Sequence, residues 1–296
     1  MAEFSTSEHE LVLVIDFGGQ YNQLIARRVR ECSVYCEVRP YTTPVAEIKA
    51  MAPIGIIFTG GPNSVYDPAS PQADPEIFKL GIPILGICYG CQLIAHNLGG
   101  RVTAATADSA REYGKTETYF RTDCKLFKGL PAESVTWMSH GDYMAKVPEG
   151  FALVAHSDAC PNVAIADEKR GFYGVQYHPE VNHTEHGVDM IRNFLYEVCG
   201  AKGDWTMGDY KNTAIAAVRE KVGSARSLGD MEVKKSFWNW REKAAPWKEL
   251  VTTAEACRNR PKNSRGPASK TSSAAPSIFR RAPASCTMGQ PVRADR

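Results

Sequence analysis

Apolar residues in the N-terminal third of the chain form short, continuous runs bounded by turn residues. Such runs are typical of strands that are buried on both faces of a parallel sheet. The strands predicted in this way are residues 11–15, 35–41, 54–58 and 83–87. Between and after them, helical spacing of apolar residues predicts helices at residues 21–30, 45–51 and 92–98. Strands that alternate with helices predict an α/β fold, an open and mostly parallel sheet with helices on both faces.

The pattern changes between residues 101 and 177, where short apolar segments are separated by turn residues. This spacing is typical of hairpins, so we expect short antiparallel strands added to the parallel core. The segments are residues 102–103, 117–120, 135–138, 151–155, 162–166 and 172–177. After them, Val188, Ile191 and Leu195 fall on one helical face, and this helix is predicted to close the domain near Gly200.

These patterns predict one folded domain at residues 11–200, preceded by a polar extension at residues 1–10. Residues 201–222 are expected to form a linker and, by the family resemblance described below, the start of a truncated further domain. From Cys257 onward the chain contains nine Lys or Arg residues against one acidic residue, with many Ser, Pro and Ala residues. This composition favours disorder for residues 223–296. A shifted reading frame or a truncated gene explains the abrupt change in composition equally well.

Composition and charge narrow the possible partners and the compartment. The net charge of +2 over 296 residues gives no reason to expect a nucleic acid or a membrane as partner. The nine cysteines show no disulfide framework, which favours a reducing cytoplasm. No apolar run approaches the length of a transmembrane helix, and the first ten residues lack the apolar centre of a signal peptide.

The segment Gly86-Ile87-Cys88-Tyr89-Gly90 contains the strongest candidate for a nucleophile. It joins a predicted strand to a predicted helix, and glycines two residues to either side of Cys88 permit the sharp turn that lifts a side chain out of a sheet. A helix N-terminus also favours the thiolate form of a cysteine. Two alternatives remain open, an inert core cysteine and a redox pair of Cys88 with Cys91. No Cys/His cluster of zinc spacing follows in the sequence, so no metal site is predicted.

A candidate base for this thiol is His178, which follows the predicted strand at residues 172–177. Glu180 lies two residues further on, so both side chains point to the same side where the chain is extended. A cysteine, a histidine and an acidic residue that orients it form a common arrangement for nucleophilic catalysis. For this segment alone, a surface histidine beside an unrelated glutamate remains an alternative. His183 and His186 are interpreted as solvated residues at a helix start rather than a metal pair.

Together these two segments resemble the class I, or triad, glutamine amidotransferases. In that family a cysteine attacks the side-chain amide of glutamine and releases ammonia. The resemblance therefore implies a flavodoxin-like fold and catalytic roles for Cys88, His178 and Glu180. Other segments resemble the GMP synthases more narrowly, and this similarity covers about residues 10–222. They are residues 16–21, 59–66, 139–142 and 203–207.

The resemblance also implies an oxyanion hole and a substrate pocket. The backbone amides of Gly61 and Tyr89 would bind the oxyanion. The residues that would hold L-glutamine are Gly60, Gln92, Ser139, Gly141 and Asp142, the last of them suited to the α-amino group. On the residue pattern alone, the alternatives are an ordinary turn at Gly60-Gly61, helix packing for Gln92, and a solvated turn at residues 139–142.

The function implied by the resemblance is the glutaminase part of a GMP synthase, which supplies ammonia for the amination of XMP in purine biosynthesis. The glutaminase needs no cofactor. ATP and Mg²⁺ serve the synthetase half of that family, and neither is expected to bind this chain because residues 223–296 lack a Gly-rich phosphate loop. A synthetase domain or subunit is the implied partner. Rival hypotheses are a redox protein that uses Cys88 and Cys91, and an inactive domain that only docks onto a synthetase.

Overall fold

The computed structural model of this chain describes residues 9–105, 111–206, 208, 211–212 and 215–216. The predicted domain at residues 11–200 is therefore described except for residues 106–110. The predicted tail at residues 223–296 and much of the predicted linker at residues 201–222 lie outside the described residues.

Within this part of the chain, five parallel strands form one half of a larger sheet, in the order β2-β1-β3-β4-β11 with β2 at the edge. Their bounds are Leu11–Asp16 for β1, Tyr35–Pro40 for β2, Gly55–Phe58 for β3, Ile84–Ile87 for β4 and Phe172–Val175 for β11. This is the strand order of flavodoxin-like folds, with β11 in the fifth place. The predicted α/β class with a mostly parallel sheet is thus confirmed.

Beyond β11 the sheet continues with the antiparallel strands β10 (Ala164–Asp167), β9 (Ala152–His156), β6 (Glu112–Phe120) and β7 (Glu133–His140). The added antiparallel strands are therefore confirmed as well. β6 begins at Glu112 rather than at Glu117, because its polar first residues pair with β7 as far as His140. A separate two-stranded sheet pairs β5 (Arg101–Ala104) with β8 (Asp142–Lys146).

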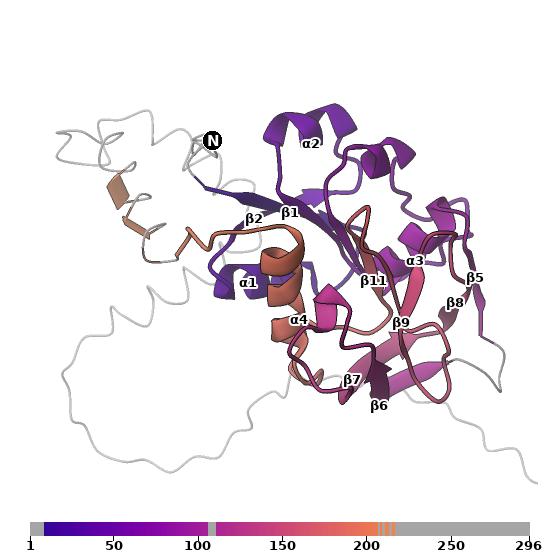
Figure 1. The fold of residues 1–296 in the computed structure, drawn as a ribbon. Helices are drawn as coiled ribbons and strands as arrows, with labels where there is room; N and C mark the ends of the chain where they lie inside the picture. The colour runs from indigo at the N-terminus through magenta and orange to yellow at the C-terminus, as the bar shows by residue number, and fades with distance from the viewer. Residues whose placement is uncertain (1–8, 106–110, 207, 209–210, 213–214, 217–296) are drawn as a thin grey trace, which may run out of the picture. The chain divides into compact units, whose positions relative to one another are not determined.

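Helices cover both faces of the parallel sheet, as Figure 1 shows. On one face, α1 (Asn22–Glu31) packs against α4 (Gly187–Asn193), which continues as a π-helical turn, η4, at Phe194–Val198. The other face carries α2 (Val45–Met51) and α3 (Tyr89–Asn97). Short 3-10 turns lie at Pro75–Lys79 (η2) and Lys125–Phe127 (η3). No helix in the described ranges is long and apolar enough to cross a membrane.

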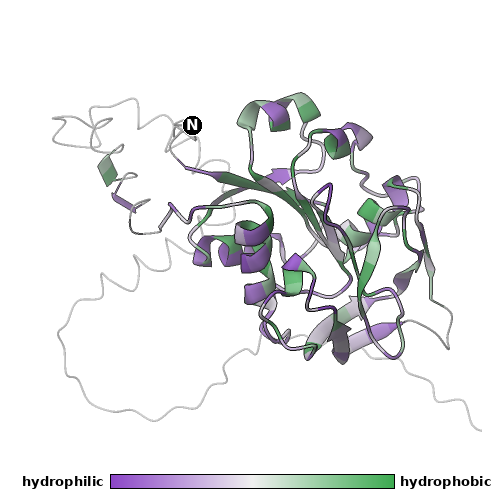
Figure 2. Cartoon of the chain, in the orientation of Figure 1, coloured by the Kyte–Doolittle hydropathy of each residue, from purple (hydrophilic) through white to green (hydrophobic). Residues whose placement is uncertain are grey.

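The continuous apolar runs of the parallel strands are explained by two hydrophobic cores, one on each face of the sheet. Val12 and Val14 of β1 pack with α1 and α4, whereas Leu13 and Ile15 face α2 and α3. Successive side chains of a strand point to opposite faces, so both sets must be apolar. Figure 2 shows hydrophobic residues along the central strands and hydrophilic residues on the outward sides of the helices.

The carboxyl ends of four neighbouring parallel strands lead into the candidate site. Gly18-Gly19 follows β1, Gly60-Gly61 follows β3, Cys88 directly follows β4, and His178 follows β11. Ligands of open α/β sheets bind beyond the carboxyl ends of the strands, near the point where the strand order reverses. The topology therefore gathers these four segments at one edge of the sheet.

Two local features lie outside the sequence pattern. The alternative of a solvated turn at residues 139–142 does not describe the structure, because Ser139 belongs to β7 and Asp142 begins β8. The packed chain also continues beyond Gly200: Trp205 is buried, and its backbone N–H donates to the Ser33 carbonyl at 3.2 Å.

The turn after β4 gives a prediction about stability. A Cβ atom at Gly90 would lie 2.5 Å from the Phe58 carbonyl oxygen, which is backbone and has no room to move. We expect Gly90→Ala to lower the free energy of unfolding by about 3 kcal/mol, measured by urea denaturation. The matched control is Gly129→Ala, which meets no atom within 4 Å but has a φ of 76° and should cost about 1 kcal/mol. Equal losses in the two variants would contradict the prediction.

Candidate active site

Cys88 lies between β4 and α3 in a strained backbone conformation. Its φ of 52° and ψ of −108° are rarely adopted by a residue with a side chain. The turn is tight: a Cβ atom at Gly86 would lie 2.5 Å from the backbone of Gly90. Hydrogen bonds from Cys88 N to the Val175 carbonyl, and from Gln92 N to the Cys88 carbonyl, hold the turn on both sides. This arrangement matches a nucleophile elbow.

The Cys88 side chain is largely buried, with two polar neighbours besides the histidine. Gln176 Nε2 donates to Cys88 Sγ at 3.7 Å, and the Ser139 carbonyl oxygen is 3.9 Å from the same sulfur. The Gln176 N–H points at a sulfur that becomes a better hydrogen-bond acceptor whenever it carries negative charge. The residue pattern did not single out Gln176, although a glutamine at the end of a buried strand is a signal that a polar contact is required.

His178 and Glu180 form a buried pair, as their spacing predicts. His178 Nδ1 lies 2.8 Å from Glu180 Oε1, and the two side chains are 8% and 0% exposed. Because Glu180 occupies Nδ1, the remaining ring nitrogen, Nε2, is available to Cys88. The second carboxylate oxygen, Oε2, is buried and has no hydrogen-bond partner among the described residues. The charge of Glu180 is therefore balanced chiefly by His178.

Distant segments hold this pair in place. Arg28 of α1 donates from Nε to the Glu180 carbonyl at 2.9 Å, and Thr184 Oγ1 donates to the His178 carbonyl at 2.6 Å. The His178 N–H in turn donates to the Trp137 carbonyl of β7 at 3.0 Å. The backbone on both sides of the histidine is thus fixed by contacts that sequence spacing does not reveal.

The surroundings favour the charged form of His178. Burial is the largest influence and opposes protonation of the ring, but hydrogen bonds and charge interactions with Cys88 and Glu180 outweigh it. Together they raise the pKa of His178 to about 10. The imidazolium form of His178 is therefore the favoured form at neutral pH.

Two hollows of about 370 and 360 Å³ meet at Cys88. The first is bounded by Gln92 and the residues from Ser139 to Asp142, and the second by Gly18-Gly19, His178 and Glu180. Gly61 and Ser139 line both hollows. The structure thus brings all predicted catalytic and binding side chains around one sulfur atom.

The glycines after β3 lie directly against the reactive side chains. A Cβ atom at Gly60 would be 3.3 Å from His178 Cε1 and 3.7 Å from Cys88 Cβ. At Gly61, a Cβ atom would be 2.9 Å from the Phe17 carbonyl oxygen. Tyr89 is the first residue of α3, a position whose N–H has no partner within the helix. The ordinary-turn reading of Gly60-Gly61 does not account for this close approach.

The amide of Gln92 connects the two sides of the first hollow. Its Nε2 donates to the Asp142 carbonyl at 3.0 Å and to Gln176 Oε1 at 3.1 Å. The Asp142 carboxylate accepts hydrogen bonds from Ser64 Oγ and from Tyr66 OH. Gln92 is therefore not a mere packing residue, and Asp142 is held rather than freely solvated.

Cys91 has surroundings that differ sharply from those of Cys88. It is fully buried, and this burial raises its pKa far above the usual range of a thiol. A redox pair needs an accessible thiolate, so the geometry does not support this rival reading. Among the described residues, no group of three or more His, Cys, Asp or Glu side chains is arranged to hold a metal ion.

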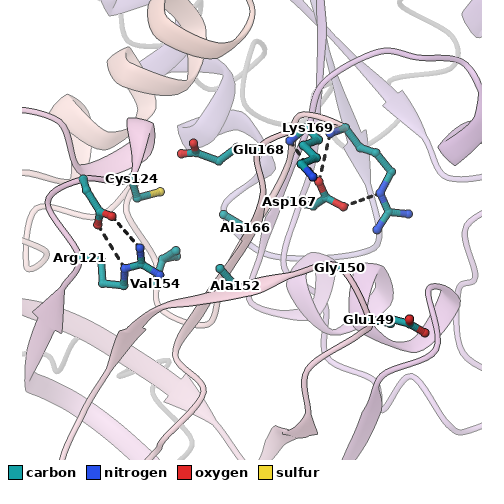
Figure 3. A pocket seen from close by; sticks show the side chains of 12 residues that line it. Arg121, Cys124, Glu149, Gly150, Ala152, Val154, Ala166, Asp167, Glu168 and Lys169 are labelled. Atoms are coloured by element: carbon teal, nitrogen blue, oxygen red, sulfur yellow. Dashed lines mark hydrogen bonds and ion pairs between the residues drawn. The ribbon is translucent and has the colours of Figure 1, made fainter.

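A larger hollow of about 720 Å³ shares no lining residue with the two hollows at Cys88. Its lining, seen in Figure 3, includes two ion pairs, Arg121 with Asp123 and Arg170 with Asp167. Size alone therefore does not mark the active site. The strained cysteine and its buried histidine distinguish the smaller hollows.

Comparison with protein families agrees with this geometry. The profile described as "Glutamine amidotransferase class-I" matches residues 13–198, more than half of the 296 residues. The chain belongs to this family. The matched range begins in β1 and ends at the last residue of η4, so it contains every predicted site residue.

Curated relatives include two clostridial enzymes named GMP synthase (glutamine-hydrolyzing). The protein of Clostridium perfringens (strain 13 / Type A) is 55% identical over 219 residues, which are 74% of this chain and 42% of that protein. The protein of Clostridium botulinum (strain Alaska E43 / Type E3) is 55% identical over 221 residues, 75% of this chain and 42% of that protein. The chain thus spans less than half the length of these relatives.

Solved structures share the fold. A Thermoplasma acidophilum protein described as one subunit of a GMP synthase superimposes with a TM-score of 0.56 at 28% identity, covering 70% of this chain and 98% of that one. A glutamine amidotransferase from Thermotoga maritima gives a TM-score of 0.51 at 19% identity, covering 66% of this chain and all of that one. At 19% identity, the similarity to the Thermotoga maritima structure is evidence of a shared fold only.

The charge state of His178 leads to a prediction that NMR can check. We expect the imidazole of His178 to titrate well above pH 8 in the wild-type chain, and at lower pH in Cys88→Ala, which removes one of its charge partners. Because the folded-state pKa is raised, the stability that this protonation contributes is complete below pH 6.5 and is lost as the pH rises through about 10. Cys91→Ala is the control and should leave the titration unchanged. Identical midpoints in wild type and Cys88→Ala would contradict the prediction.

Proposed function

We propose that this chain hydrolyses L-glutamine to glutamate and ammonia, with Cys88 as nucleophile. The observation that carries the proposal is a cysteine in a strained turn, bordered by two hollows and by a buried His178 with a raised pKa. Membership of the class I glutamine amidotransferase family supports the same conclusion. Cys88, His178 and Glu180 are the proposed catalytic residues.

In the first half of the reaction the Cys88 thiolate attacks the carbon of the glutamine side-chain amide, forming a C–S bond and an oxyanion. Protonated His178 then gives its Nε2 proton to the departing nitrogen, so that the C–N bond breaks and ammonia leaves. In the second half His178 removes a proton from water, whose oxygen attacks the thioester carbon; the C–S bond then breaks, so that glutamate leaves and the Cys88 thiolate beside protonated His178 is restored. Glu180, 2.8 Å from Nδ1, stabilises the imidazolium in both halves.

The backbone N–H groups of Gly61 and Tyr89 are the proposed oxyanion donors. Tyr89 follows the nucleophile at the start of α3, and Gly61 lines both hollows at Cys88. Donors that are fixed before the reaction stabilise the developing charge without reorganisation, which is worth about 3 kcal/mol for each donor. We further propose that Gln176, which donates to Cys88 Sγ, helps to keep the sulfur ionised.

The first hollow is the proposed site for the amino acid part of glutamine. Its lining includes Gln92, Ser139, Gly141 and Asp142 beside Cys88, and Gly60 contacts both reactive side chains. The Asp142 carboxylate would bind the α-amino group, since each oxygen has a lone pair left beyond its bond to Ser64 or Tyr66.

We propose that the ammonia serves the amination of XMP to GMP in the cytoplasm. The support is the identity of 55% to proteins named GMP synthase, of which this chain spans 42%. A synthetase domain or subunit is then the required partner, and ATP and Mg²⁺ are bound there rather than by this chain.

A turnover assay tests the glutaminase. We expect Cys88→Ala to lower ammonia release from glutamine by at least about 1,000-fold, because the nucleophile is lost. Cys91→Ala should stay within about threefold of wild type if its small cavity is tolerated. An electrophilic glutamine analogue should label Cys88 in wild type. Label on Cys91, or equal activity of Cys88→Ala and wild type, would refute the proposal.

The link to GMP is tested by reconstitution. We expect the chain, mixed with the synthetase part of the Clostridium perfringens relative, XMP, ATP, Mg²⁺ and glutamine, to form GMP, and Cys88→Ala to form none. Ammonium in place of glutamine should restore GMP formation with Cys88→Ala, because it bypasses the glutaminase. GMP formed from ammonium by this chain without the added synthetase part would show that we have misassigned ATP binding.

A further inference from the structure

Three side chains outside the predicted site form a buried polar cluster. They are Glu112 at the start of β6, His140 at the end of β7, and Ser157 after β9, and each is at most 6% exposed. Glu112 and His140 are directly opposite each other in the strand register, so their side chains share one face. His140 Nε2 lies 3.3 Å from Glu112 Oε2, and Ser157 Oγ donates to Glu112 Oε1 at 2.6 Å.

The other ring nitrogen of His140 faces the backbone of the proposed substrate site. Nδ1 lies 3.1 Å from the Asp142 carbonyl oxygen, which also accepts the hydrogen bond from Gln92 Nε2. Two side chains from different elements, β7 and α3, therefore hold the same carbonyl. Asp142 itself lines the first hollow at Cys88.

The partners of this cluster determine where its protons lie. A carbonyl oxygen only accepts hydrogen bonds, so Nδ1 of His140 carries a proton. Ser157 Oγ accepts from the Cys160 N–H at 2.9 Å and gives its own proton to Glu112. If Nε2 and Glu112 Oε2 both lacked a proton, two lone pairs would face each other away from water, which is costly. One proton is therefore shared between His140 Nε2 and Glu112 Oε2.

We propose that His140, through the proton it shares with Glu112, is a positioning residue for glutamine binding. The shared proton keeps Nδ1–H directed at the Asp142 carbonyl and thereby fixes the backbone from Ser139 to Asp142. This inference rests on the proposed glutaminase function. Within the described residues, His140 makes no hydrogen bond to Cys88, His178 or Glu180, so its loss should weaken binding more than chemistry.

Glutamine kinetics test the proposal. We expect His140→Phe to raise KM about tenfold, the loss of one hydrogen bond, with kcat within about threefold of wild type. Glu112→Gln should bind glutamine with the KM of wild type, because its amide N–H donates to Nε2 and keeps the proton on Nδ1. Thr136→Val breaks the buried Thr118–Thr136 bond of the same β6–β7 pair and is the control; its KM should not change.

Nitrogen-15 NMR of the seven histidines gives a readout that needs no activity and no destabilising variant. We expect His140 to be protonated at Nδ1 at neutral pH in both wild type and Glu112→Gln. A His140 protonated only at Nε2, or a His140→Phe variant whose KM equals that of wild type, would overturn the inference. Absence of glutamine turnover in the wild type would instead refute the proposed function, and the NMR result would still decide the state of the pair.

Discussion

The positive φ of Cys88 is the constraint on which the rest of the site depends. A residue with a Cβ atom pays about 1–3 kcal/mol for such a conformation, so the surrounding fold must enforce it. β4 leads into the turn, α3 leads out of it, and Gly86 and Gly90 allow the two to approach at backbone contact distance. The strain presents the sulfur at the edge of the sheet, where both hollows meet.

At this position the sulfur is surrounded by charged groups that interact mainly with one another. Glu180 is buried and directs its charge to His178, whose ring faces Cys88. Burial disfavours each of these charges alone, and together they stabilise one another. The backbone of the pair is fixed by Arg28 from α1 and by the Trp137 carbonyl of β7, so a helix and a distant strand contribute to a single proton-transfer unit.

Hydrogen bonds of neutral amides extend from this charged centre to the proposed substrate pocket. Gln176 donates to the sulfur and accepts from Gln92, which also donates to the Asp142 carbonyl. His140 holds that same carbonyl from the other side. The nucleophile and the backbone that would bind glutamine are therefore parts of one network, in which each amide orientation is determined by the next partner.

The sequence by itself determined three features of this protein. The parallel strands follow from the continuous apolar runs, and the elbow at Cys88 follows from the glycines two residues to either side of it. The pairing of His178 with Glu180 follows from their spacing of two residues in extended chain. The sequence did not predict β8 or the early start of β6, whose polar residues are strands only because β5 and β7 offer partners. Gln176, Glu112 and Ser157 were likewise missed. Their roles come from residues far away in the chain, and only the tertiary structure brings such donors and acceptors together.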